Sequence, residues 1–378
     1  MRRMVRDLER YYLVSLLQAK GMGRQRAAGL IKYFGSAEAV WQADSPELKQ
    51  SGILPAEVLA AWSLFRQKQN NLPEQMAEIC QKQKIRICTP ADEEYPPLLK
   101  RIYDPPLALY YRGRLDRLDK CLAIVGARKA TPYGMAAAEQ LAASIAKAGI
   151  TIVSGGAYGI DTAAHRGALK QGVTVAVLGC GVDVVYPAAN RKLFAAIEEG
   201  GAIISEYPPG TKPLPAFFPV RNRIISGIAK GTLVVEAAEK SGSLITAGMA
   251  LEEGRDVYAV PGSVFSPLSR GCHRLLQQGA KLVMDSTDII EDYFTAAAVK
   301  DKKKDKNQEA QQPLLPQEQK KVYELLSYSS PLTVDEIVAK LNSDVNEIAF
   351  SLLQLELSGL ASRTESHAYV RKIKEGLL

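Results

Sequence analysis

Seven short apolar runs, separated by amphipathic stretches, organise the middle of the chain. Their hydrophobic residues are continuous rather than alternating, which is typical of strands covered by helices on both faces. The runs are Cys121–Gly126, Ile150–Gly155, Val173–Gly179, Ala202–Tyr207, Gly231–Ala237, Asp256–Gly262 and Ala280–Met284. This pattern predicts an α/β fold class, with a Rossmann-like, doubly wound parallel sheet over residues 121–295.

The first helix between these strands has clear end signals. Thr131 can cap its N-terminus, Pro132 fits its first position, and Gly149 follows its last turn. One face is apolar and carries Met135, Ala138, Leu141, Ala142 and Ile145. We therefore expect this helix to pack directly on the sheet.

Residues 1–90 show helical periodicity and predict a separate helical domain. Within it, Gly21–Ser36 resembles a helix-hairpin-helix or SAM-like module, with Gly35 as the C-cap of the second helix. Such a turn can present N–H groups to a DNA phosphate, with Arg24 and Arg26 beside it. It can equally be a tight turn between two core helices, and both interpretations remain open.

The other segments are connectors and a C-terminal domain. Residues 91–120 are rich in proline and tyrosine and predict an extended connector, and residues 296–318 are charged and predict a flexible linker. Residues 319–378 predict a winged-helix-like domain, in which Thr333 and Glu336 form a capping box. Its third helix carries acidic but no basic residues, which favours a protein-contact or structural role over duplex DNA binding.

Composition narrows the class of protein. The chain has 378 residues and five scattered cysteines, and no stretch approaches the ~20 apolar residues of a membrane span. We therefore expect a cytoplasmic protein with reduced thiols and no membrane association. The net charge is +7, and residues 1–91 hold 14 Lys and Arg against 8 Asp and Glu. That excess favours a polyanionic partner without specifying one.

Several catalytic signatures are missing. The first strand ends in GARKATPYG rather than GxGxxG, the second ends in Ser154 and Gly155 rather than an acid, and no P-loop occurs. The three histidines do not assemble a nucleophilic triad. These absences disfavour redox and nucleotide-hydrolysing enzymes, and we expect no cofactor.

Glycines and basic residues instead gather in the loops that follow the predicted strands. Gly126 and Arg128 follow the first strand, Gly155 and Gly156 follow the second, and Phe218, Arg221, Asn222 and Arg223 open a later helix. Carboxyl ends of parallel strands meet at one sheet edge, where glycine nests and arginine forks suit repeated phosphodiesters. Tyr158, Phe217 and Phe218 could stack on bases.

Four further side chains are expected to have structural roles. Asp161 and His165 are four residues apart on a predicted helix, so we expect a hydrogen-bonded pair that holds the glycine loop. Glu236 and Glu252 are expected to support loops or helices.

Eight ordered motifs, among them AIVGARKATPYG, IVSGGAYGIDTAAHRGAL and FPVRNRIISG, resemble the DprA or Smf family of DNA-processing proteins over about 200 residues. The resemblance implies a cytoplasmic homodimer that binds single-stranded DNA and loads RecA onto it during natural transformation and recombination, with no known catalysis.

The resemblance also implies which residues bind DNA. The family's pocket arginine corresponds to Arg128, whereas a frequent family lysine is replaced here by Pro215, for which Lys212 could substitute. The DNA-binding residues that we expect are Gly126, Arg128, Lys129, Ser154, Gly155, Gly156, Lys212, Phe218, Arg221, Asn222 and Arg223.

Two alternatives compete with this assignment. The core also resembles the LOG-family phosphoribohydrolases, enzymes that act on nucleoside monophosphates, although Pro261–Ser263 continues as Val-Phe rather than as their glutamate-bearing loop. The second alternative is a regulator that binds duplex DNA through the winged helix.

Overall fold

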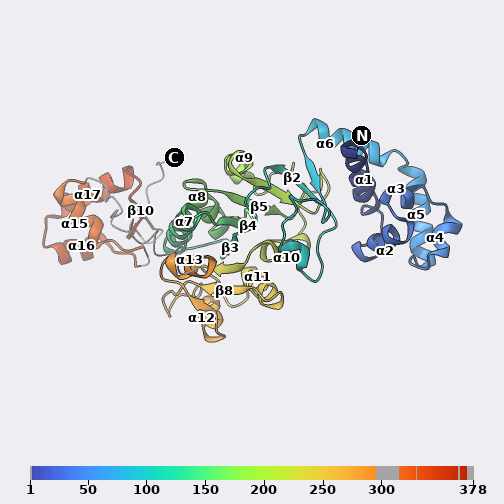
Figure 1. Ribbon diagram of the computed structural model, residues 1–378. Coiled ribbons are helices and arrows are strands. Elements are labelled where there is room, and N and C mark those ends of the chain that lie inside the picture. Colours follow the sequence, from blue (N-terminus) through green and yellow to red (C-terminus); the bar gives the residue numbers. More distant parts are fainter. Residues whose placement is uncertain (1, 295–314, 329, 365–366, 373–378) are drawn as a thin grey trace.

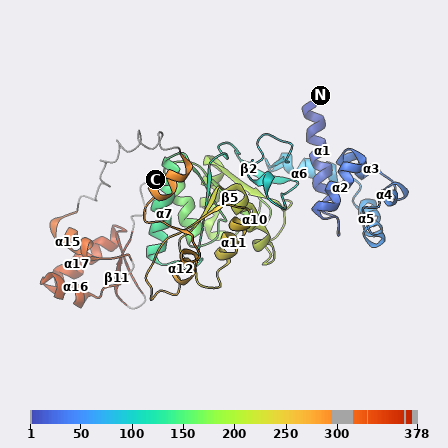
Figure 2. The same cartoon turned by 60° about the horizontal axis from the view of Figure 1, so that its bottom comes forward.

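A computed structural model describes residues 2–294, 315–328, 330–364 and 367–372. Figure 1 shows an N-terminal group of helices, a central α/β body and a C-terminal helical unit, and Figure 2 shows the same arrangement turned by 60°. The predicted linker lies almost wholly outside the described residues. Among those residues, no helix combines the length and apolar character needed to cross a bilayer.

The central body is built on a nine-stranded sheet in the order β1-β2-β6-β5-β4-β3-β7-β8-β9. All seven predicted strands are present: β3 Cys121–Val125, β4 Thr151–Ser154, β5 Thr174–Leu178, β6 Ala202–Ser205, β7 Gly231–Val234, β8 Asp256–Ala259 and β9 Lys281–Leu282. They are mutually parallel. The α/β prediction is therefore confirmed.

Two additional strands at one edge were not predicted. β2 (Leu109–Gly113) pairs antiparallel with β6, and β1 (Arg86–Cys88) pairs antiparallel with β2. The stretch interpreted as a connector thus supplies a sheet strand, and the sheet begins before residue 91. β1 is only three residues long, so its pattern is too short to distinguish from a loop.

Helices cover both faces of the sheet. α10 (Phe217–Ile228), α11 (Gly242–Glu252) and α12 (Arg270–Gln277) share one hydrophobic core with the strands. α7 (Pro132–Lys147), α8 (Ile160–Leu169) and α13 (Thr287–Tyr293) share the core on the other face, and α9 (Arg191–Gly200) packs toward the β1–β2 edge. Thr131 caps α7 as predicted, by accepting a hydrogen bond from the Gly134 N–H at 3.1 Å.

The strand order reverses at β3, and this reversal sets where a ligand can bind. The chain moves outward from β3 through β4 and β5 to β6, then returns to place β7 on the other side of β3. Where the loops after two neighbouring parallel strands run in opposite directions, a crevice opens at the carboxyl ends of those strands. The loops after β3 and β7 are therefore the expected walls of a site.

Six helices form the N-terminal domain: α1 Arg2–Leu16, α2 Arg24–Phe34, α3 Ala37–Gln42, α4 Ser45–Gln50, α5 Ala56–Lys68 and α6 Leu72–Lys82. Trp41 and Trp62 are buried edge to face with ring centroids 5.2 Å apart, so they are core residues as predicted. The same core continues into sheet residues such as Tyr110 and Ile203. The helices are therefore packed against the sheet edge that β1 and β2 form.

The C-terminal unit has the predicted three helices and β-ribbon. α15 (Gln317–Leu325), α16 (Val334–Leu341) and α17 (Val345–Leu357) precede the antiparallel strands β10 (Ala361–Arg363) and β11 (Tyr369–Arg371). The capping box of Thr333 and Glu336 is present. These elements enclose a hydrophobic core of their own.

Candidate nucleic-acid interface at the carboxyl edge of the sheet

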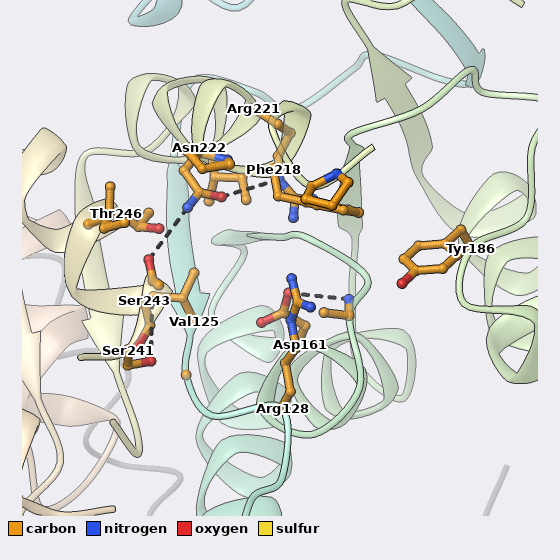
Figure 3. Close-up of a pocket in the computed structure, with 17 residues that line it drawn as sticks. Val125, Arg128, Asp161, Tyr186, Phe218, Arg221, Asn222, Ser241, Ser243 and Thr246 are labelled. Atoms are coloured by element: carbon orange, nitrogen blue, oxygen red, sulfur yellow. Dashed lines mark hydrogen bonds between the residues drawn. The ribbon is translucent and has the colours of Figure 1, made fainter. Parts of the chain in front are cut away.

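A pocket of about 480 Å³ lies at the carboxyl ends of the central strands. Its walls come from the loop after β3, the glycine loop after β4, the start of α10 and the start of α11. In Figure 3, Arg128 enters from one loop, Phe218 and Arg221 come from α10, and Ser241, Ser243 and Thr246 lie on the opposite side from Tyr186. The predicted edge is thus a real concavity.

Arg128 is exposed at this pocket, and the loop that carries it is held from below. The neighbouring Ala127 N–H donates to the Glu236 carbonyl at 2.7 Å. The Glu236 carboxylate accepts from Thr131 N–H at 2.8 Å and from its hydroxyl at 2.5 Å, while burial raises the pKa of Glu236. Glu236 therefore supports the loop, as predicted.

Gly126 is required by close packing. A Cβ at this position would lie 2.6 Å from Ile160 and 2.9 Å from the Glu236 carbonyl oxygen. Any larger residue would push the β3 loop away from α8, and Arg128 would move with it.

The glycine loop is stabilised internally rather than left open to a ligand. The Asp161 carboxylate accepts from the N–H groups of Gly155 at 3.1 Å and Ala157 at 3.3 Å. Gly156 has a φ of +66°, and a Cβ there would lie 2.6 Å from Phe194. The Gly155 N–H, which the sequence predicts as a phosphate donor, is therefore already bonded to Asp161. Ser154 is fully buried and donates to the Ile124 carbonyl, so its hydroxyl is also structural.

The predicted pair of Asp161 and His165 does not form. His165 Nδ1 lies 2.7 Å from the Thr174 hydroxyl, which itself donates to the Ile152 carbonyl at 2.8 Å. Because the threonine proton is already used, Nδ1 must carry the histidine proton, and buried Nε2 has no partner among the described residues. Burial and the nearby Arg221 charge lower the pKa of His165 to about 3.

Arg221 forms the floor of the pocket instead of reaching freely into it. Its side chain is buried, with 4% of the residue exposed, and Nη1 donates to the carbonyls of Gly155, at 2.8 Å, and Val177. Burial lowers its pKa, which the Asp161 charge partly opposes. Arg221 therefore ties α10 to the glycine loop and adds positive charge beneath the pocket.

Aromatic rings lie next to this charge. The Phe218 ring centroid is 5.3 Å from the Arg128 guanidinium carbon, 5.8 Å from that of Arg221 and 5.8 Å from the Tyr186 ring. Tyr158 and Tyr186 are about half exposed, whereas Phe217 stacks on Tyr207. Sequence reasoning missed Tyr186, although a tyrosine in the loop that follows β5 could have indicated it.

The remaining predicted residues divide between pocket and surface. Asn222 lines the pocket, and its Oδ1 accepts from Arg221 Nε at 3.3 Å. Lys129 and Lys212 are exposed but are not among the residues that line the pocket. The position of the replaced family lysine, Pro215, does line it.

Arg223 points away from the pocket into an ion-pair cluster. Its guanidinium contacts Glu206 at 2.5 Å and donates to the Asp104 backbone carbonyl at 2.8 Å. Arg24 of the helical hairpin pairs with the Asp104 carboxylate and, at 2.9 Å, with Glu206. These contacts favour the structural interpretation of the hairpin, because Arg24 joins the helical domain to the sheet domain.

The third helix of the winged-helix unit, α17, carries no basic side chain. α17 exposes Phe350, Leu353 and Leu357, with 61%, 50% and 74% of each residue accessible, and its exposed charges are Glu347 and Glu356. An apolar and acidic helix face suits a protein contact better than a phosphate backbone.

Comparison with known proteins supports this description. The chain matches the family model of DNA recombination-mediator protein A over residues 86–294, and the DprA winged helix domain over residues 306–365. Protein Smf of Synechocystis sp. is 34% identical over 397 aligned positions, covering 96% of this chain and 99% of that protein. DNA processing protein DprA of Streptococcus pneumoniae is 46% identical over 213 positions, covering 56% and 75%.

Two solved structures share the fold. DprA from Streptococcus pneumoniae superposes with a TM-score of 0.65 and 39% identity, over 74% of this chain and 96% of that one. DNA processing protein A from Helicobacter pylori, for which a single-stranded DNA binding mode is described, superposes with a TM-score of 0.51 and 31% identity, over 58% and 97%. The chain therefore belongs to the DNA recombination-mediator protein A family, also called DprA or Smf.

Proposed function

We propose that this protein binds single-stranded DNA in the pocket at the carboxyl edge of the sheet, without catalysing a reaction on it. The observation that carries the proposal is Arg128. It is exposed at the pocket, lies beside the Phe218 ring, and forms no ion pair within the described residues. An unpaired guanidinium next to an aromatic ring can hold a phosphate while the adjacent base stacks.

The form of the pocket favours a single strand over a duplex. A concavity of about 480 Å³ can admit one nucleotide whose base has left the stack. In a duplex the bases are stacked and paired inward, so only the backbone could reach this surface. Phe218, Tyr158 and Tyr186 offer stacking faces that do not discriminate between bases.

The experiment is an anisotropy titration of a fluorescent oligothymidine with Arg128→Ala. We expect weaker binding, a salt dependence of log affinity that is shallower by about 0.7, and a nearly unchanged melting temperature because Arg128 is exposed. Lys129→Ala is the matched control, since it removes the same charge one residue away but outside the pocket lining. Equal losses in both variants would indicate diffuse attraction and contradict a pocket site.

The second part of the proposal is that the protein forms a homodimer and loads RecA onto DNA during natural transformation. This part rests on family membership. On DNA covered by single-strand binding protein, RecA begins to hydrolyse ATP only after a delay. Addition of this protein should shorten that delay, and the Arg128→Ala variant should not shorten it. Light scattering should give twice the mass of the chain. An unchanged delay, or the mass of one chain, would contradict the respective part.

The alternative is a phosphoribohydrolase acting on nucleoside monophosphates. That activity needs a glutamate at the ligand, and none of the described residues that line the pocket is a glutamate. Asp161 also lines it, and one oxygen of its carboxylate, Oδ2, already accepts from two loop amides. Incubation with AMP followed by chromatography tests this alternative, and adenine above the buffer blank would favour the enzyme.

A further inference from the structure

The start of α11 forms the wall of the pocket that lies opposite Tyr186 (Figure 3). Ser241 is its N-cap, and the Ser241 hydroxyl accepts from the Ser243 N–H at 3.3 Å and lies 2.8 Å from the Ser243 hydroxyl. Thr246 lies one turn further along the helix. The role proposed for Arg128 does not explain why Ser243 and Thr246 line the pocket.

Thr246 is the unusual member of this wall. It is 1% exposed and lines the pocket, yet its hydroxyl makes no hydrogen bond within the part of the chain that the structure describes. A threonine in a helix ordinarily donates to a carbonyl of the preceding turn. Unlike the Thr232 hydroxyl, the Thr246 hydroxyl is not among the fully buried oxygens without a partner, so it is reached from the pocket and can bond a ligand that enters there.

The electrostatics of the wall favour an anion. α11 has eleven residues and no acidic residue in its first turn, so the positive end of its dipole is not neutralised there. A Cβ on Gly242 would meet nothing within 4 Å, so a ligand can approach the backbone closely at that residue. Lys240 precedes the cap and is exposed.

We propose that the Gly242 N–H and the hydroxyls of Ser243 and Thr246 form a second phosphate subsite, for the phosphodiester that follows or precedes the one at Arg128. This inference rests on the proposed function, since both subsites serve one DNA strand. A strand would then enter the pocket with its phosphates at two walls and the intervening nucleotide between them.

Thr246→Val tests the subsite, because valine keeps the shape and removes only the hydroxyl. Removing a hydroxyl that bonds no other described residue should leave the melting temperature nearly unchanged. Affinity for an oligothymidine should nevertheless fall about tenfold, as expected for a lost hydrogen bond to a charged group. The salt slope should stay constant, because a hydroxyl displaces no counterion, in contrast to Arg128→Ala.

Thr232→Val is the matched control. Thr232 on β7 is also fully buried with an unpartnered hydroxyl, but it does not line the pocket. This variant should have the same thermal behaviour and unchanged DNA affinity. Ser243→Ala provides a second variant at the wall, with the same expected loss of affinity and an unchanged salt slope.

The outcomes separate this inference from the proposed function. If Arg128→Ala weakens binding but Thr246→Val and Ser243→Ala do not, the second subsite is wrong and the DNA pocket stands. If none of the three variants weakens binding, the proposed function is also wrong. The test is completed with an oligonucleotide of abasic units. If Thr246→Val still lowers the affinity tenfold for this ligand, the wall contacts phosphate. If the variant and the parent protein bind it equally, the wall contacts a base.

Discussion

The buried imidazole of His165 should make the sheet domain sensitive to mild acid. In the unfolded chain this side chain titrates near its ordinary pKa of 6.5, whereas in the folded protein the pKa is lowered to about 3 by burial. Between these pH values the unfolded state binds more protons than the folded state. Stability is therefore fully present above pH 6.5 and is lost as the pH falls.

The magnitude follows from the two pKa values. Between pH 7.5 and pH 5, the histidine should reduce the free energy of unfolding by about 2 kcal/mol. This figure changes little if the folded pKa lies a unit above or below 3, because at pH 5 the folded side chain is neutral in either case. The structural reason is that Nε2, the nitrogen that would take the proton, is buried without an acceptor.

The measurement is urea unfolding followed by circular dichroism at pH 7.5 and pH 5, for the parent protein and for His165→Asn. Asparagine can still donate to the Thr174 hydroxyl but cannot titrate. Burial raises the pKa values of Asp161 and Glu236, so these carboxyl groups make the folded state more stable as the pH falls, opposite to His165. Because both carboxyl groups are present in the parent and in the variant, their effect cancels in the comparison. The variant should lose about 2 kcal/mol less than the parent over this interval. Equal losses would refute the reasoning.

Three further changes test the packing around the pocket. Arg221→Met removes the donor to two buried backbone carbonyls and should lower the free energy of unfolding by about 3 kcal/mol or more, measured by urea unfolding, whereas Arg128→Ala should change it by less than about 0.5 kcal/mol. Gly159→Ala puts a Cβ 2.2 Å from the Ala127 carbonyl oxygen at a φ of +73°, so the melting temperature should fall by several degrees, and an unchanged value would contradict this packing. Arg24→Met should lower the free energy of unfolding by only about 1 kcal/mol, because its side chain is 30% exposed, and the difference should shrink in high salt.

The central sheet could be predicted because its signal is local. Each of the strands β3 to β9 is a continuous apolar run, and the capping residues of α7 and α16 lie beside the helices that they cap. β1 and β2 were missed because β2 joins the sheet by pairing with β6, about 90 residues later in the sequence, and β1 joins only through β2. Such partners cannot be identified from short segments alone.

A pocket lies at the sheet edge where the sequence predicts a site, but only some of the predicted residues line it. Arg221 and Arg223 look equivalent in the sequence, yet residues two apart on a helix point in different directions, so they cannot both face one pocket. One is buried in the pocket floor and the other pairs with Glu206. Thr246 gave no signal, because nothing in the sequence distinguishes a threonine whose hydroxyl lacks a partner.

The ion-pair cluster of Arg24, Asp104, Glu206 and Arg223 has a consequence for fragments of this protein. With all four side chains the cluster is neutral, since two positive charges face two negative ones. A fragment limited to residues 86–294 would lose Arg24 and leave a net charge of −1 beside α10, the helix that carries Phe218. That charge would repel an approaching phosphate backbone, most strongly in dilute salt. If the protein binds DNA as proposed, the helical domain would therefore strengthen that binding without touching DNA, because Arg24 cancels a negative charge beside α10.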